Sequence, residues 1–269
     1  SISTGVENIL IGGNAGDALT SGAYNIAIGR NALGAEDAHG RNVAVGHSAL
    51  AAQDAGADAY NVAVGFWAGL SVTTGTNNTL IGGLAGDAMQ AGSYNIALGY
   101  NAMGVGNASS ATGYNIGIGI DAAQNITSGR FNIILGGEAG DAITTGTSNV
   151  AIGHGSLGAE STHGKNTAVG QSTLAAQNAG ADAYNVAVGY NAGLSVSTGV
   201  QNTLIGSLAG DALTTGTENV VVGYAALSSE DANGKNVAVG SYALNALNAG
   251  ADAYNVALGY QAGYLVSTG

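Results

Sequence analysis

Polar and apolar residues alternate in one short phrase that recurs along the whole chain. The phrase is Asn, a mostly aliphatic residue, a small or aliphatic residue, an aliphatic residue and Gly. Because side chains of an extended strand point alternately to its two faces, this alternation predicts a short β-strand after each Asn. The phrase begins at Asn8, Asn25, Asn42, Asn61, Asn78, Asn95, Asn115, Asn132, Asn149, Asn166, Asn185, Asn202, Asn219, Asn236 and Asn255.

The two faces of the predicted strands differ in size. The first and third residues after Asn are β-branched or Leu almost throughout, whereas the middle residue is mostly Ala. An Ala seven residues after Asn, followed by Gly or Leu, indicates a second, shorter strand beyond a glycine bend. A helix is the competing interpretation because Ala is the best helix former, but Gly recurs at the same point and costs a helix about 1 kcal/mol each time.

Successive phrases lie 17 to 20 residues apart, and a fixed period of this length indicates one unit stacked on itself. The sequence therefore predicts an all-β fold, a parallel β-solenoid (β-roll or β-helix) of about 15 rungs. We expect one repeat array over residues 1–269, with longer blocks at 6–75, 76–129, 130–199 and 200–269. The chain opens and closes at the same point of the repeat, so we expect a fragment of a longer protein.

The small face of Asn, Ala and Gly suits close approach by another backbone. A lone rung of this size buries little apolar area, so we predict that three parallel chains share one core, as an intertwined or side-by-side homotrimer. The alternative is a single-chain β-helix with one repeat per turn.

Composition narrows the classes of function. The net charge is −12, with 17 acidic residues against five basic ones, which argues against nucleic acid and against an anionic membrane surface. No segment has the ~18 consecutive apolar residues of a membrane helix. Only 8% of residues are charged and Cys is absent, so we expect an extracellular or virion-surface protein without disulfides.

Few residues predict a specific site. We expect the Asn array to be structural, its amides bonding between rungs or capping turns. Phe66 and Trp67 are the candidates for glycan contact, and Trp67 breaks the repeat. Asp58, Asp182 and Asp252 recur in the 19-residue repeats and are weak calcium candidates beside the interpretation as solvated turn residues. We expect no catalytic group, no cofactor and no metal site, and hence no enzyme.

Residues 185–199 (Asn-Val-Ala-Val-Gly-Tyr-Asn-Ala-Gly-Leu-Ser-Val-Ser-Thr-Gly) and the corresponding residues 255–269 resemble a known repeat. It is the Asn-x-Ala-Ile-Gly-x-x-Ala-Leu…Thr-Gly repeat of phage tail fibres and related chaperone-terminated surface proteins. The chain is also similar to the head repeat of trimeric autotransporter adhesins, whose unit is shorter. Both resemblances cover the whole chain and imply parallel homotrimers outside the cell.

The expected function is therefore the structural shaft of a trimeric extracellular fibre that gives rigid reach for attachment to a host or surface. The expected partner is the chain itself, as a homotrimer. Two alternatives remain open. One is an adhesin that binds cell-surface glycans or a receptor along its sides, and the other is a filament subunit that assembles end to end through exposed strand edges.

Overall fold

The computed structural model describes residues 3–105 and 113–268, so the terminal residues Ser1, Ile2 and Gly269 lie outside it. The chain divides into two compact units, Ser1–Asn132 (unit 1) and Ile133–Gly269 (unit 2). Both are β-solenoids of short parallel strands, and the described residues contain no helix. This confirms the predicted all-β solenoid. No helix in the described part of the chain is long and apolar enough to cross a membrane.

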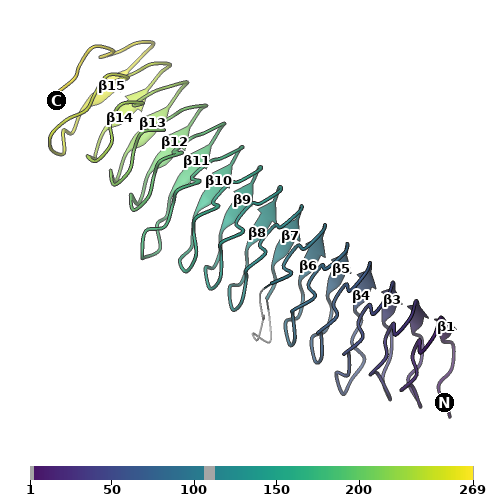
Figure 1. Cartoon of the computed structure of the whole chain (residues 1–269). Helices are drawn as coiled ribbons and strands as arrows, with labels where there is room; N and C mark the ends of the chain where they lie inside the picture. Colours follow the sequence, from purple (N-terminus) through teal and green to yellow (C-terminus); the bar gives the residue numbers. More distant parts are fainter. Residues whose placement is uncertain (1–2, 106–112, 269) are drawn as a thin grey trace. The chain divides into compact units, whose positions relative to one another are not determined.

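Every strand has three residues and begins directly after an Asn of the array, as the alternation predicts (Figure 1). Unit 1 contains β1 (Ile9–Ile11), β2 (Ile26–Ile28), β3 (Val43–Val45), β4 (Val62–Val64), β5 (Thr79–Ile81), β6 (Ile96–Leu98) and β7 (Ile116–Ile118). Unit 2 contains β8 (Ile133–Leu135), β9 (Val150–Ile152), β10 (Thr167–Val169), β11 (Val186–Val188), β12 (Thr203–Ile205), β13 (Val220–Val222), β14 (Val237–Val239) and β15 (Val256–Leu258).

Within each unit, every strand pairs in parallel with the next one in sequence, without offset. Ile9, Leu10 and Ile11 of β1 face Ile26, Ala27 and Ile28 of β2, and the same register holds between β8 and β9. Equivalent residues therefore stand in columns along each unit. This is the arrangement expected when one supersecondary unit repeats and contacts only its neighbours.

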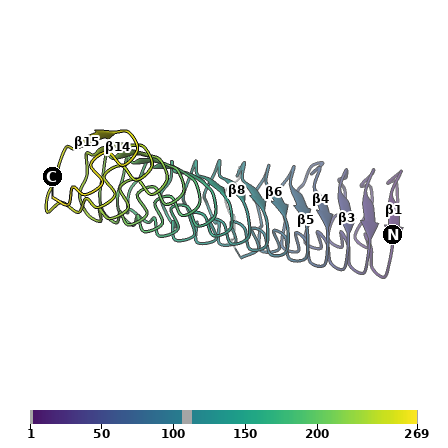
Figure 2. The same cartoon turned by 90° about the horizontal axis from the view of Figure 1, so that it is seen from above.

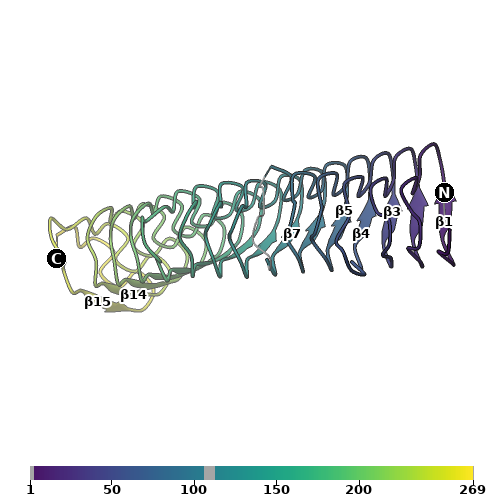
Figure 3. The same ribbon diagram turned by 90° about the horizontal axis from the view of Figure 1, so that it is seen from below.

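The described residues of the return segments contain no second strand, so that expectation was wrong. In unit 1, the views from above and below show strands such as β3 and β4 continuing into loops that close the coil (Figure 2, Figure 3). The sixth and eighth residues after Asn adopt left-handed backbone conformations, for example Asn31 (φ 57°) and Leu33 (φ 51°). These conformations bend the chain, although Leu33 N–H still bonds to the Ala49 carbonyl of the next rung at 3.0 Å.

The small face of the strands is the interior of each chain's own coil, not a surface open to another chain. The middle strand residues Ala27, Ala44 and Ala63 are fully buried in unit 1, as are Ala168 and Ala187 in unit 2. The inference that this face receives partner chains was therefore wrong. The physical reason is the narrowness of the coil, because the return segment lies close enough to the strand to bury the small residues without help.

Side-chain sizes inside the coil compensate one another. Where the middle strand residue is Ala, the eighth residue after Asn is often large and buried, as in the pairs Ala27 with Leu33 and Ala151 with Leu157. Where the middle residue is Ile134, that position is Gly140. A Cβ atom on Gly140 would lie only 2.9 Å from Ile143 Cδ1 and 3.1 Å from Ile134 Cδ1. In these rungs the interior can thus be filled from either side of the coil.

This compensation predicts that Ile134 and Gly140 are energetically coupled. Ile134→Ala alone should cost about 2–5 kcal/mol through a cavity, and Gly140→Leu alone about 1–3 kcal/mol or more through overpacking. The double variant Ile134→Ala/Gly140→Leu should be more stable than either single variant, because the β14 rung already combines Ala238, Leu244 and Leu247. Urea unfolding midpoints measured by circular dichroism test this. Strictly additive losses in the double variant would contradict the coupling.

Candidate functional site

The first and third residues of each strand form an apolar surface on the outside of each unit, which we call the outer stripe. Its residues are aliphatic except for Thr79, Thr167 and Thr203. They are half-buried or exposed, for example Ile96 at 39% and Val220 at 40% exposure. Large contiguous apolar patches are uncommon on monomeric proteins and mark interaction surfaces. The outer stripe is therefore the main candidate functional surface.

Aromatic side chains stack along the unit beside the stripe. They stand at the position before Asn, and in three successive rungs the rings of Tyr94, Tyr114 and Phe131 lie nearly parallel. Their centroids are 4.9 Å and 5.7 Å apart, and the rings remain about half exposed. In unit 2, three tyrosines that follow the strands form a second group, in which Tyr242 contacts Tyr224 and Tyr264 edge to face. These ladders widen the apolar surface, since aromatic pairs of this kind are attractive beyond their buried area.

Three cationic side chains at the same position are held by the aspartates of the 19-residue repeats. Arg41 Nε lies 2.7 Å from Asp58 Oδ2, and its guanidinium lies 5.4 Å from the ring of Tyr24 and 5.5 Å from that of Tyr60. In unit 2, Lys165 Nζ lies 2.6 Å from Asp182 Oδ2 and donates a hydrogen bond to Tyr184. Lys235 repeats this arrangement with Asp252 and Tyr254.

In unit 2, the lysine pairs shift the pKa values of Asp182 and Asp252. The hydrogen bond from Lys165 lowers the pKa of Asp182, and the same bond raises the pKa of Lys165. The second oxygen of each aspartate accepts a backbone N–H, from Gly40 to Asp58, from Gly164 to Asp182 and from Gly234 to Asp252. Each carboxylate is thus shared between a cation and a backbone donor, which does not favour the weak calcium prediction at these positions.

The Asn array runs as a ladder through the interior of each unit. All of its members except Asn8 and Asn255 are buried. Asn61 Oδ1 accepts the backbone N–H of Asn78 at 2.8 Å, and Asn78 Oδ1 accepts that of Asn95 at 2.9 Å. Asn78 Nδ2 donates to the Gly92 carbonyl at 2.7 Å, which ties the strand to the end of its own rung. One amide thereby satisfies backbone groups on two rungs, where an unpaired buried group would be costly.

Phe66 and Trp67, the candidates for glycan contact, lie together on the surface of unit 1. The Phe66 ring stacks between His47, at 5.3 Å, and Trp67, at 4.8 Å between centroids. Phe66 is 52% and Trp67 38% exposed. An exposed flat stack of this kind is a surface on which an apolar face of a sugar ring can pack. It is local, whereas the outer stripe extends over every rung.

The sequence analysis missed the polar residues buried in the return segments. Glu36, Glu160 and Glu230 are fully buried at equivalent positions of three blocks, and Gln53 and Gln177 are buried in the 19-residue repeats. Gln53 Oε1 accepts from Asn61 Nδ2 at 2.7 Å, and Gln177 does the same for Asn185. Burial raises the pKa of Glu36 and Glu160 above the ordinary value for a carboxyl group. The available signal was their recurrence at one repeat position.

Comparison of the chain with protein-family models, with curated proteins and with solved structures finds no match. The functional argument therefore depends on the outer stripe, the aromatic ladders and the buried polar residues.

The Asn ladder predicts a large loss of stability on substitution of Asn78. Asn78→Ala leaves the buried Asn95 N–H and Gly92 C=O without their partner, at an expected cost of about 2–4 kcal/mol. The neighbouring variant Asn77→Gly is the control, because Asn77 is exposed and has a left-handed backbone (φ 58°) that Gly adopts freely. Urea midpoints measured by circular dichroism should fall for Asn78→Ala and change little for Asn77→Gly. Equal midpoints for both variants would show that the ladder is dispensable.

Proposed function

We propose that the chain is the structural shaft of a homotrimeric extracellular fibre, of the kind found in phage tail fibres. The observation that carries the proposal is the outer stripe, an apolar sheet face that the chain's own fold leaves uncovered. Its residues repeat in unbroken register within each unit. In a parallel trimer around a threefold axis, the same rung of each copy stands at the same height. The three stripes then match along their length.

The chemistry of the surface supports the same assembly. The stripe is uncharged, and charged side chains beside it, such as Arg41 and Lys165, are already paired with aspartates of their own chain. Association through the stripe would bury aliphatic surface without stripping water from an unpaired charge. The small number of basic residues also leaves few sites for trypsin-like proteases, which suits a fibre exposed outside the cell.

Charges placed on the stripe test the trimer. By light scattering after gel filtration, the wild-type chain should have about three times the 26.0 kDa mass of one chain. Val64→Glu/Ile81→Glu puts like charges from three copies close together and should shift the mass towards one chain. The control Thr74→Glu/Gln90→Glu adds the same charge at exposed polar positions and should leave the trimer intact.

Circular dichroism should give the same folded signal for both variants, because the substituted side chains point out of the coil. A wild-type mass of one chain would refute the trimer. A trimer that tolerates Val64→Glu/Ile81→Glu would remove the stripe as its interface. Very large species that persist in the stripe variant would instead support filaments joined end to end.

A second candidate function is glycan binding along the side, and the stack of His47, Phe66 and Trp67 favours it. Trp67 is the one Trp of the sequence, so tryptophan fluorescence reports on this surface alone. If the stack binds sugars, oligosaccharides of bacterial surface polysaccharide should change the Trp67 emission saturably, and Phe66→Ser should weaken the effect. An emission that does not respond to any of the sugars tested would count against an adhesin that uses this stack.

A further inference from the structure

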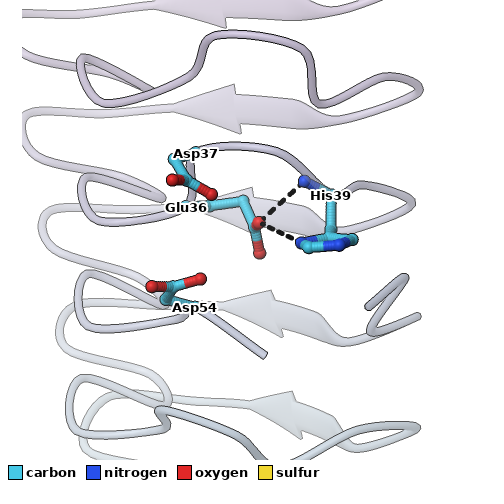
Figure 4. A group of neighbouring side chains, drawn as sticks. All are labelled: Glu36, Asp37, His39 and Asp54. Atoms are coloured by element: carbon cyan, nitrogen blue, oxygen red, sulfur yellow. Dashed lines mark hydrogen bonds and ion pairs between the residues drawn. The ribbon is translucent and has the colours of Figure 1, made fainter. Parts of the chain in front are cut away.

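Four side chains that can ligate a metal converge on one edge of unit 1 (Figure 4). Glu36, Asp37 and His39 come from the loop between β2 and β3, and Asp54 comes from the loop between β3 and β4. One ligand atom from each residue can be chosen so that all four lie within 4.8 Å of one another. Figure 4 shows the Glu36 carboxylate between the His39 ring on one side and the two aspartates on the other.

Two buried atoms of this cluster have no hydrogen-bond partner among the described residues. The Glu36 side chain is fully buried, and its Oε1 accepts the His39 backbone N–H at 3.0 Å. Its Oε2 is buried without a hydrogen-bond partner, and so is His39 Nδ1. Burying a carboxylate oxygen or an imidazole nitrogen without a partner is costly. A bound cation would satisfy both atoms at once.

The same loop occurs twice more in the chain and provides an internal comparison. In the block of residues 130–199, the equivalent residues are Glu160, Ser161, His163 and Asn178, so both aspartates are replaced. The Nδ1 atom of His163 is 2.8 Å from the hydroxyl oxygen of Thr162, whereas the residue before His39 is Ala38. The His39 ring therefore lacks the local partner that His163 has.

In the block of residues 200–269, Asn233 replaces the histidine, with Glu230, Asp231 and Asn248 at the other equivalent positions. Here both oxygens of the buried glutamate are satisfied within the chain. Glu230 Oε1 accepts Asn233 N–H at 3.0 Å, and Oε2 accepts Ala249 N–H at 3.0 Å. Of the three loops, the first alone combines a histidine with three carboxylates.

We propose that Glu36, Asp37, His39 and Asp54 bind one divalent transition-metal ion of the zinc class. One imidazole and carboxylates form a donor set suited to Zn²⁺, whereas Ca²⁺ and Mg²⁺ prefer oxygen ligands alone. Metal–ligand bonds of about 2.0–2.2 Å require the ligand atoms to draw together from their present spacing. Asp37 and Asp54 are exposed, so their side chains have room to turn inward. Glu36 is buried, and its carboxylate is fixed by the hydrogen bond from the His39 backbone N–H.

A metal ion at this site would cross-link two neighbouring rungs. Three ligands belong to the loop after β2 and the fourth to the loop of the 19-residue repeat after β3, so a bound ion joins the two loops. A bound cation would also reduce the mutual repulsion of the three carboxylates. Because the ion binds the folded loops, it should stabilise the fold by mass action.

Zinc titration of the chelator-treated full chain at neutral pH tests the site. Isothermal titration calorimetry should give about one Zn²⁺ per chain, with a rise in melting temperature. Two variants introduce the residues that the other two blocks have at the equivalent positions. They should be compatible with the fold, because the chain already contains these residues there. His39→Asn and Asp37→Ser/Asp54→Asn should each lower zinc affinity at least tenfold and abolish the rise in melting temperature.

The matched control is His163→Asn, which removes the equivalent histidine of the second loop and should leave zinc affinity unchanged. In the third loop, Asn233→His/Asn248→Asp should add a second zinc equivalent per chain. Absence of stoichiometric zinc binding would overturn the proposal. Binding that survives both first-loop variants, or that is lost in His163→Asn, would also overturn it. Calcium binding of equal strength that is insensitive to His39→Asn would exclude the zinc class.

Discussion

The close stacking of backbone on backbone between rungs is the constraint on which the rest of the structure depends. The glycine that ends each strand shows how little space remains. A Cβ atom on Gly46 (φ 138°) would lie 2.1 Å from the carbonyl oxygen of Gly65 on the next rung. No other residue fits both this conformation and this distance. The strand length, the position of the turn and the register of the whole rung follow from that contact.

Stacking at this distance also sets what the interior can hold. The interior is narrow, so a small residue on one side often faces a large one on the other, as Ala27 faces Leu33 in one rung and Gly140 faces Ile134 in another. Polar backbone groups inside such a narrow coil have no water to bond to, and the Asn ladder supplies the missing partners. The close stacking of rungs also explains how Tyr24 and Arg41 hold left-handed backbone conformations (φ 61° and 65°). Inter-rung hydrogen bonds on both sides fix a backbone that would be strained in isolation.

The strands were predictable from the sequence because their determinants are local. The alternation after Asn8 or Asn185 fixes an extended segment, and Gly terminates it. Which of the two strand faces points into the coil could not be predicted in the same way. Val186 and Ala187 differ in size, and the small face that contains Ala187 was expected to receive partner chains. Which face points inward depends on the path of the return segment. That path is set by left-handed residues such as Asn191 (φ 54°), whose conformation no propensity of Asn alone dictates.

The burial of the glutamate carboxylates could not be predicted from the sequence for a related reason. Glu36 lies among Ala, Asp and His in a stretch that reads as a solvated loop, and charged residues are rarely buried. Its burial follows from a three-dimensional fact, namely that the carboxylate caps the His39 N–H at the point where the coil turns. Asp37 and Asp54 both lie 12 residues after an Asn of the array, so the repeat places them on neighbouring rungs, whereas the burial of Glu36 beside them depends on the path of the return segment.

Variation in repeat length supports the assignment of the two sides of the coil. The 19-residue repeats place their extra residues in the return segment, where Gly56 and Gly180 border open space. Asp58 and Asp182 then fasten the longer loop to the previous rung through Gly40 and Gly164. The strand side keeps three residues in every rung regardless of repeat length. A surface kept uniform while the opposite side varies is the one expected to meet an equally uniform partner. The loop side can carry local features such as the cluster at Glu36 without disturbing that contact.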